Sequence, residues 1–216
     1  MLLCGYFEGY LREMFSEFVN KINDSKVSVS LIPDAMISEI LTTYVGKKDK
    51  VRISGVINSI YSDSEYEMFH KPFSETDANP TVDVIDRLFS NIGVEKVLDH
   101  VTLKDYSDID AMYTQESPID NGLRRKIDRE LGGIKTDEII NLIEGKWPPK
   151  KKRRRIGYVG FIDNLLKHRN CIAHGERVDD ISPNDLIIWV QQIESLTDSL
   201  VTLLEEKYSF IVMDAK

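Results

Sequence analysis

Apolar residues recur at spacings of three and four along most of the chain, which is the pattern of amphipathic helices. The segment 6–23 shows it most clearly, and its apolar side would consist of Phe7, Tyr10, Leu11, Met14, Phe18 and Ile22. Proline near the first position and glycine after the last one mark several further helix ends. Together these signals predict helices over 33–46, 80–93, 94–101, 120–131, 136–143, 158–173 and 182–208.

The remaining segments lack a clear helical period. The Val and Ile content of 51–61 suits a strand, but nothing nearby would pair with one, so a helix is favoured there. The composition predicts a polar loop over 63–80, an acidic connector over 105–118, and a Pro-Pro turn followed by six basic residues over 146–155. We therefore expect an all-α bundle in which the first helix, the 158–173 helix and the last helix pack together.

Length and composition fit one globular domain. The 216 residues are 42% hydrophobic and 30% charged, which is enough to bury a core beneath an ordinary surface. We expect one domain over 1–216, with a variable acidic and loop-rich insertion at about 63–156. The expected core includes apolar positions of the last two helices: Leu165, Leu166, Ile172, Ile187, Ile188, Val190, Ile193, Leu196 and Leu200.

The sequence also bounds the compartment and the cofactors. No apolar run approaches the roughly 20 residues of a membrane-spanning helix. The apolar start 1–7 lacks a basic leader and meets Glu8 at once, so a helix already under way explains it better than a secretory signal. Two cysteines, Cys4 and Cys171, do not make a disulfide framework, and a reducing cytoplasm is expected. Since no Gly-rich phosphate loop or zinc-like Cys/His spacing occurs, we expect no cofactor and no metal.

Charge is unevenly distributed along the chain. The net charge of −8 argues against a nucleic-acid partner at first sight. However, 121–177 contains 15 Lys/Arg and 7 Asp/Glu, a local charge of +8, whereas 63–120 contains 14 acidic and 4 basic residues. RNA could therefore approach the basic part despite the acidic total.

The basic part contains the strongest functional pattern, 167–175, which is Lys-His-Arg-Asn-Cys-Ile-Ala-His-Gly near the end of a predicted helix. Asn170 and His174 are four residues apart and share a helix face. Arg169 and His174 are five apart, about 140° around the axis, so they would converge on one ligand only from its flanks or through a distorted helix. Gly175 is expected to end the helix.

These three residues, Arg169, Asn170 and His174, are suited to cutting RNA and are called the motif below. A histidine can give or take a proton at a phosphodiester, and a guanidinium can stabilise the charge that develops as a 2′-hydroxyl attacks. Asn170 can orient the ligand or the histidine, and no metal is needed because RNA supplies its own nucleophile. Since one chain has one such histidine, a two-fold dimer with both motifs at its interface would supply both a base and an acid.

Simpler explanations remain open for each of these residues. A histidine before a glycine is common at helix ends, and Arg-Asn pairs are common on solvated faces. His168 fits a solvated neighbour better than a ligand, and Glu8 could simply pair with Arg12 on its own helix. The basic run also suits a solvated loop or a nuclear localisation signal. The candidates for RNA binding are Lys150, Lys151, Lys152, Arg153, Arg154, Arg155 and His168.

The spacing of Arg169, Asn170 and His174 resembles the Arg-x(4–6)-His signature of the HEPN superfamily, in which a polar residue, often Asn, follows the arginine. The sequence of residues 168–175 is similar to the corresponding sequences of the predicted HEPN ribonucleases of toxin and defence loci. In that branch an early helix often carries an aromatic-Glu-Gly pattern, and 7–10, Phe-Glu-Gly-Tyr, is similar and makes Glu8 a secondary candidate. The chain departs from members that nucleotidyltransferases silence, because their Tyr two residues after the histidine is replaced here by Glu176.

The resemblance implies a HEPN-like helical bundle with inserted loops and helices, a homodimer, and a metal-independent endoribonuclease of a prokaryotic toxin–antitoxin or antiviral defence system. Its partners would be RNA and an antitoxin or another defence-system protein. Two other classes stay open: a HEPN-like module that binds RNA or protein without cleaving, and an all-α interaction protein in which the motif is incidental. Cleavage that is lost in Arg169→Ala or His174→Ala separates the first class from the others.

Overall fold

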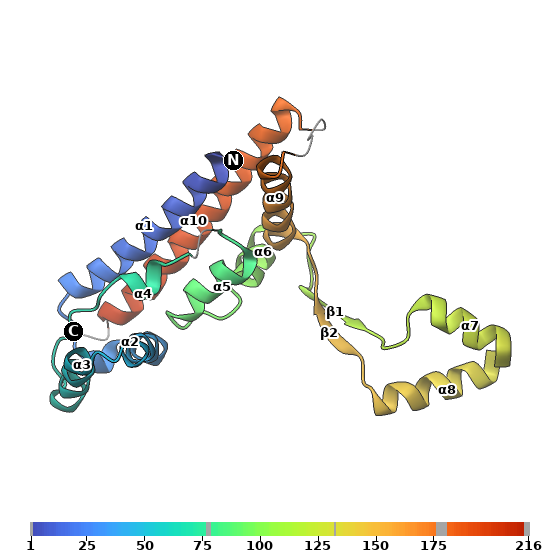
Figure 1. Ribbon diagram of the computed structural model, residues 1–216, viewed down its shortest axis with the longest axis horizontal. Helices are drawn as coiled ribbons and strands as arrows, with labels where there is room; N and C mark the ends of the chain where they lie inside the picture. Colours follow the sequence, from blue (N-terminus) through green and yellow to red (C-terminus); the bar gives the residue numbers. More distant parts are fainter. Residues whose placement is uncertain (1, 77–78, 132, 176–180, 214–216) are drawn as a thin grey trace.

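The structure is a computed structural model that describes residues 2–76, 79–131, 133–175 and 181–213. Within these ranges it is mainly helical, which confirms the all-α prediction (Figure 1). The elements, in chain order, are α1 (Leu2–Asp24), a 3-10 turn (Val29–Leu31), α2 (Asp34–Gly46), α3 (Lys50–Ser62), α4 (Lys71–Ser74), α5 (Val82–Ser90), α6 (Val97–Asp105), β1 (Tyr113–Glu116), α7 (Asn121–Leu131), α8 (Gly133–Lys146), β2 (Lys150–Arg153), α9 (Gly157–Ala173) and α10 (Pro183–Met213).

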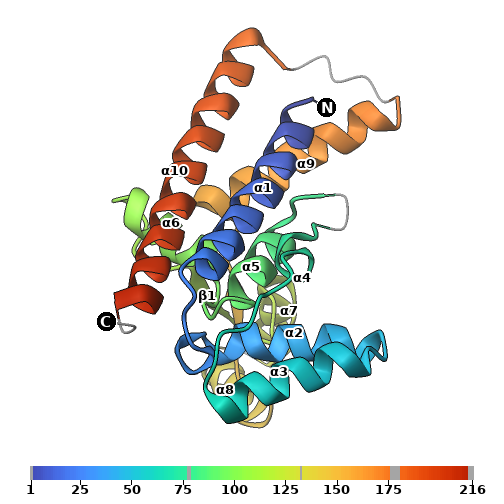
Figure 2. The same cartoon turned by 90° about the vertical axis from the view of Figure 1, so that its left-hand side faces the viewer.

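The bundle is organised around α1 and α10, which run side by side in the same direction (Figures 1 and 2). The hydroxyls of Ser25 and Tyr208, 2.7 Å apart, join the far ends of the pair. α9 packs against both helices and against α6, while α4 covers α1. The first, the motif-bearing and the last helix therefore pack together, as the apolar pattern predicts.

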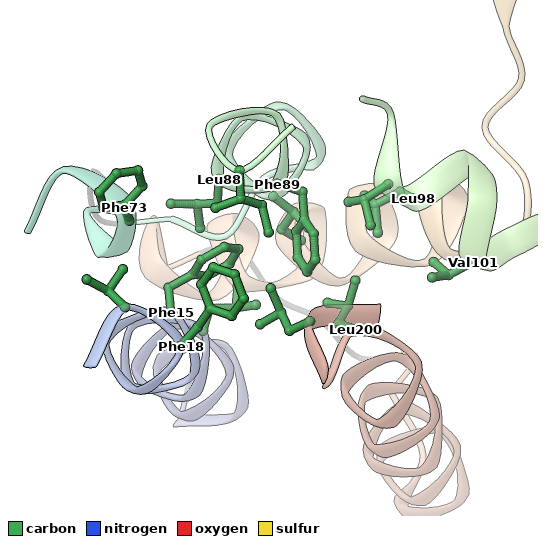
Figure 3. Packing of buried hydrophobic residues seen from close by; sticks show 14 of the residues in the cluster. Phe15, Phe18, Phe73, Leu88, Phe89, Leu98, Val101 and Leu200 are labelled. Atoms are coloured by element: carbon green, nitrogen blue, oxygen red, sulfur yellow. The ribbon is translucent and has the colours of Figure 1, made fainter. Parts of the chain in front are cut away.

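The core fills the space between α1, α5, α9 and α10. Phe15 of α1 meets Phe89 of α5 edge to face, with ring centroids 4.9 Å apart. Leu200 of α10 and Leu98 of α6 extend the same cluster (Figure 3). Burial of such large apolar side chains is the dominant stabilising term, at about 1.5–3 kcal/mol for each.

Four of the expected core residues are exposed, so this part of the prediction is wrong. Leu165, Leu196 and Leu200 are buried, and Leu166 and Ile193 pack against the core. The exposed ones all lie near the end of α9 or the start of α10: Ile172, Ile187, Ile188 and Val190. The reason is that α10, at 31 residues, begins well beyond the start of α1, so the described part of α1 does not reach the first turns of α10 (Figure 2). We call this exposed start of α10, 183–193, the overhang.

One local expectation is confirmed and two change. The 51–61 segment is helical, as favoured, within α3. The expected acidic connector contains β1, and the basic run contains β2 in place of a loop. The two strands pair antiparallel, from Tyr113 opposite Arg153 to Glu116 opposite Lys150. Beyond them α7 and α8 form a helical hairpin, and this whole arm, 113–153, projects away from the bundle (Figure 1).

Candidate functional site

The rotation of α9 is fixed at its start, far from the motif. Gly157 adopts φ +52°, in the left-handed region that favours glycine, and a side chain there would collide with Thr102. The next residue, Tyr158, donates its backbone N–H to Oγ1 of Thr102. The inner face of α9 is then buried by Tyr158, Val159, Phe161, Ile162 and Leu165. This packing determines where the motif side chains emerge further along the helix.

The end of α9 places His174 at the surface. The backbone N–H of His174 donates to the carbonyl of Asn170 at 3.0 Å, and Gly175 donates to that of Ile172 at 3.1 Å. Gly175 has φ +73°, the left-handed conformation that commonly ends a helix, so the expected stop is confirmed. His174 follows the last helical residue directly, and its imidazole is exposed.

Arg169 and Asn170 are the two motif residues that are hydrogen-bonded to each other within one chain. Nη1 of Arg169 donates to Oδ1 of Asn170 at 3.0 Å. The guanidinium is half-buried and lies towards the start of α1: burial raises the pKa of the Cys4 thiol, and the positive charge of Arg169 opposes that rise. Among the described residues, no hydrogen bond or ion pair joins Arg169 to His174, in keeping with their separation around the helix.

His168 turns away from the motif and towards α10. Its ring lies 5.2 Å from the ring of Trp189, centroid to centroid. Hydrogen bonds from Ser182 lower the pKa of Asp185, and the charge of His168 adds to that effect, so the histidine also lies near the first turn of α10. His168 therefore contacts the overhang, and the structure does not bring it together with the motif.

The basic run lies at the opposite end of α9 from the motif. α9 has 17 residues, which corresponds to about 25 Å at 1.5 Å per residue. Lys150 and Lys151 are exposed, whereas Lys152 pairs with Glu116 at 2.7 Å. Nη1 of Arg154 donates to the carbonyl of Ala111, and Arg155 lies 3.3 Å from Asp163. The run therefore lies near the root of the arm, the place where the arm joins the bundle at the start of α9, and not beside the motif.

Arg153 differs from the rest of the run because it is built into the bundle. Its side chain is 17% exposed, and it donates to Oδ2 of Asp86 at 2.6 Å and to Oδ1 of Asp99 at 2.7 Å. Burial alone would lower the pKa of Arg153, but the hydrogen bonds and charges of the two aspartates raise it overall. A guanidinium held in this way is not free to meet a phosphate, so Arg153 leaves the set of expected RNA-binding residues.

Glu8 lies in the early turns of α1 and is held by two partners. It pairs with Arg12 at 2.9 Å, as the simpler explanation expects. Thr76, fully buried, donates its hydroxyl to Oε1 of Glu8 and accepts from Nε of Arg12, both at 2.8 Å. Sequence reasoning missed Thr76, because it lies 64 residues from Arg12 in a segment expected to be a loop.

The part of the chain that the structure describes contains no cluster of His, Cys, Asp and Glu that could hold a metal ion. No helix in the described ranges has the length and apolar character to cross a membrane. Glu176, the position at which the sequence departs from nucleotidyltransferase-silenced members, lies outside the described residues. The motif itself offers an imidazole, a guanidinium and an amide.

Comparison with known proteins supports the resemblance seen in the motif. Neither the curated proteins nor the solved structures gave a match. A family model described as RiboL-PSP-HEPN matches residues 1–206, which is nearly the whole chain and includes both α1 and the motif. The helical architecture agrees with that assignment. The chain therefore belongs to the RiboL-PSP-HEPN family of HEPN domains.

Proposed function

We propose that this protein is an endoribonuclease that acts as a homodimer in the cytoplasm of a prokaryote, within a toxin–antitoxin or antiviral defence system. The observation that supports this most is the end of α9, where exposed His174 lies four residues after Asn170, which is bonded to Arg169. Family membership makes an RNA-directed role the natural setting for these three side chains.

The dimer part of the proposal rests on the overhang. Its apolar side chains Leu186, Ile187, Ile188 and Val190 are each at least 40% exposed, and Ile172 of α9 is 41% exposed. A group of exposed apolar residues on a monomer commonly marks an interaction surface. The end of α9 and the start of α10 lie at the same end of the molecule, so a two-fold contact there would bring two motifs close together (Figure 2).

In such a dimer the proton transfers divide between two identical residues. One His174 accepts the proton of the 2′-hydroxyl as its oxygen attacks phosphorus, and the other donates a proton to the departing 5′-oxygen. Arg169 stabilises the additional negative charge of the phosphorane, and Asn170 holds the guanidinium in place through its 3.0 Å bond. The products are a 2′,3′-cyclic phosphate and a 5′-hydroxyl, and the pathway includes no metal.

Exposed cations near the arm's root would attract the substrate. Lys150, Lys151 and Lys152 keep their ammonium groups at the surface, and Arg155 extends the positive area towards α9. Replacing the three lysines with serine should weaken RNA binding and flatten its salt dependence, because fewer counterions are released on binding. Unchanged binding would instead make the run a solvated strand.

The decisive experiment is cleavage of pooled RNA by the purified protein in the presence of EDTA, with the chemistry of the product ends resolved. We expect 2′,3′-cyclic phosphate ends, resistance of DNA, and a rate that rises and then falls with pH. His174→Ala should lower the rate on the order of 10²–10⁴-fold. Arg169→Lys should also be poor, because an ammonium lacks the planar fork.

His100→Ala is the matched control, since His100 is an exposed histidine of α6 and should leave the rate unchanged. Cleavage that requires magnesium or leaves 3′-hydroxyl ends would refute the mechanism. RNA binding without any product would favour the alternative of a non-catalytic HEPN-like RNA- or protein-binding module. The separation of Arg169 from His174 within one chain is the observation that keeps this alternative open.

A further inference from the structure

Most of the surface of the described part of the arm is exposed and does not pack against the bundle. In the described part of the arm, α7 buries none of its side chains and packs on α8, and the paired strands alone connect the hairpin to the bundle (Figure 1). The described buried residues of the arm are Ile119, Thr136 and Ile140, and Thr136 of α8 donates its hydroxyl to Asp128 of α7 at 3.2 Å. A projecting hairpin of this kind leaves both of its outer faces open to a ligand.

The outer face of α7 is strongly basic. Arg125, Lys126 and Arg129 are exposed, and at spacings of three and four residues they share one side of the helix. None of these three enters an ion pair with a described residue, whereas Arg124 pairs with Asp137 at 3.1 Å. Taken together, α7 and β2 carry eight Lys/Arg residues against two acidic ones, and three of the eight, Arg124, Lys152 and Arg153, are paired with carboxylates. Cations that the protein leaves without partners are suited to a polyanion.

A hollow with an aromatic wall lies between the basic helix hairpin and the basic strand. Its volume is about 530 Å³, and its lining includes Pro118, Trp147 and Pro149 together with Lys146, Lys150 and Glu116. The indole of Trp147 is 55% exposed, and Nζ of Lys146 lies 4.8 Å from its ring centroid. The backbone N–H of Trp147 donates to Ile143 at 2.7 Å, so the ring is held on a continuation of α8.

We propose that the arm is a binding site for single-stranded RNA, in which a base stacks on Trp147 and the backbone phosphates follow Lys146, Lys150 and the basic face of α7. This rests on the proposed RNA-directed function and adds to it an RNA site away from the motif, which shares Lys150 with the basic run. An aromatic platform flanked by cations is the arrangement that holds single strands, because every unpaired base offers a face for stacking. A duplex keeps its bases stacked internally and cannot use Trp147 in this way.

The position of the arm sets a minimum length for RNA that uses both sites. The arm joins the bundle at the start of α9, and the motif lies at its end, about 25 Å away. At about 3.4 Å per stacked nucleotide, a strand must exceed roughly seven nucleotides to reach from the arm's root to the motif of the same chain. Shorter RNA would contact one site at a time.

The test uses RNA that cannot be cut. A single-stranded 2′-O-methyl oligonucleotide lacks the attacking hydroxyl, so its binding is measured independently of cleavage. The protein contains two tryptophans, and Trp189→Phe leaves Trp147 as the one reporter of fluorescence. We expect the oligonucleotide to quench Trp147, and a blunt duplex of the same length to quench it much less.

Two variants and one control complete the experiment. Trp147→Ala should weaken binding of the single strand by about 5- to 150-fold, the range for loss of one stacked base. The triple variant Arg125→Ser, Lys126→Ser and Arg129→Ser should weaken it and flatten its salt dependence. The control triple Lys47→Ser, Lys50→Ser and Lys104→Ser removes the same charge from exposed positions on the bundle and should have a much smaller effect.

Binding that is unchanged in both arm variants would overturn the proposal and leave the arm to a protein partner. Equal quenching by duplex and single strand would overturn the stacking role of Trp147. Loss of binding in the arm variants supports the proposal even if the wild-type protein cleaves no RNA. Failure of the ribonuclease proposal is therefore distinguishable from failure of this one.

Discussion

At the scale of single residues, Arg153 is set apart from the other cations of the 150–155 run by its two aspartate partners. Arg153→Ala would leave the carboxylates of Asp86 and Asp99, both under 10% exposed, without a counter-charge. Removal of one partner from a buried ion pair typically costs about 3–5 kcal/mol of unfolding free energy. Urea denaturation should show this loss, whereas Arg154→Ala, on a more exposed side chain, should change stability by about 1 kcal/mol or less. Equal midpoints for the two variants would contradict the structural role.

The raised pKa of Tyr158 predicts that the free energy of unfolding falls at alkaline pH. Its hydroxyl donates to Oδ2 of Asp105 at 2.8 Å and lies 2.9 Å from the hydroxyl of Ser195. Burial, with Asp105, raises its pKa from 10.0 to about 12. The unfolded chain therefore loses this proton first, so the stabilising contribution is present below pH 10 and is lost as the pH rises to 12.

Denaturation midpoints measured across this range should fall more steeply for the wild-type protein than for Tyr158→Phe, which has no proton to lose. Tyrosinate absorbance of the wild-type protein should include a group, absent from Tyr158→Phe, that ionises only as the fold is lost. A wild-type curve parallel to that of the variant would argue against the raised pKa.

The sequence anticipated local pairs at this scale better than distant ones. The Glu8 and Arg12 pair follows from helical spacing alone, and so does the glycine that ends α9. Thr76 as the bridge between Glu8 and Arg12, and Asp86 as the partner of Arg153, depend on contacts across 64 to 68 residues. Composition and spacing contain no signal for such contacts.

At the scale of elements, helical periodicity predicted which residues share a face but not what covers that face. The apolar stripe of α10 continues without a break past the start of α1, so Ile187 and Leu200 look alike in the sequence although one is 56% exposed and the other fully buried. The strands were missed for a related reason. The described residues of β1 and β2 are almost all exposed and lack the apolar alternation that marks a strand in a sequence. Each strand pairs with a partner that is far away along the chain, and a local pattern contains no sign of it.

The overhang gives a prediction about assembly. Ile187→Glu should shift sedimentation of the protein from dimer towards monomer and lower RNA cleavage, because a charge would be buried in the proposed contact. Stability of the single chain should change by no more than about 0.5 kcal/mol, since the residue is exposed there. Val51→Glu places the same charge on an exposed apolar residue of α3 and should leave the dimer intact. A dimer that survives Ile187→Glu with full activity would remove the overhang from the interface.

At the scale of the whole molecule, the arm can be removed at a point that the strand register defines. Glu116 and Lys150 are direct partners in the ribbon, so an Asn-Gly turn between them would replace 117–149 and close a regular hairpin. We expect the bundle to fold with its thermal midpoint little changed, because α7 and α8 pack on each other and the paired strands connect them to the bundle. Cleavage of RNA longer than about a dozen nucleotides should weaken, and cleavage of fragments below roughly seven should not.

Circular dichroism and a comparison of kcat/KM on long and short RNA would measure both effects. A shortened protein that fails to fold would show that the arm stabilises the bundle. Equal kcat/KM on long RNA with and without the arm would show that the substrate does not use it.

The two legs of the arm meet where the backbone N–H of Arg154 donates to the carbonyl of Met112 at 2.8 Å. The chain thus leaves the bundle and returns to it at neighbouring points, and Met112 is buried there. Closing such a loop costs little more free energy when the loop grows, because the cost rises only with the logarithm of its length. Insertions of different lengths should therefore be tolerated at this junction. Related chains could exchange the arm for shorter or longer attachments during evolution, and a foreign binding module could be grafted there without redesign of the bundle.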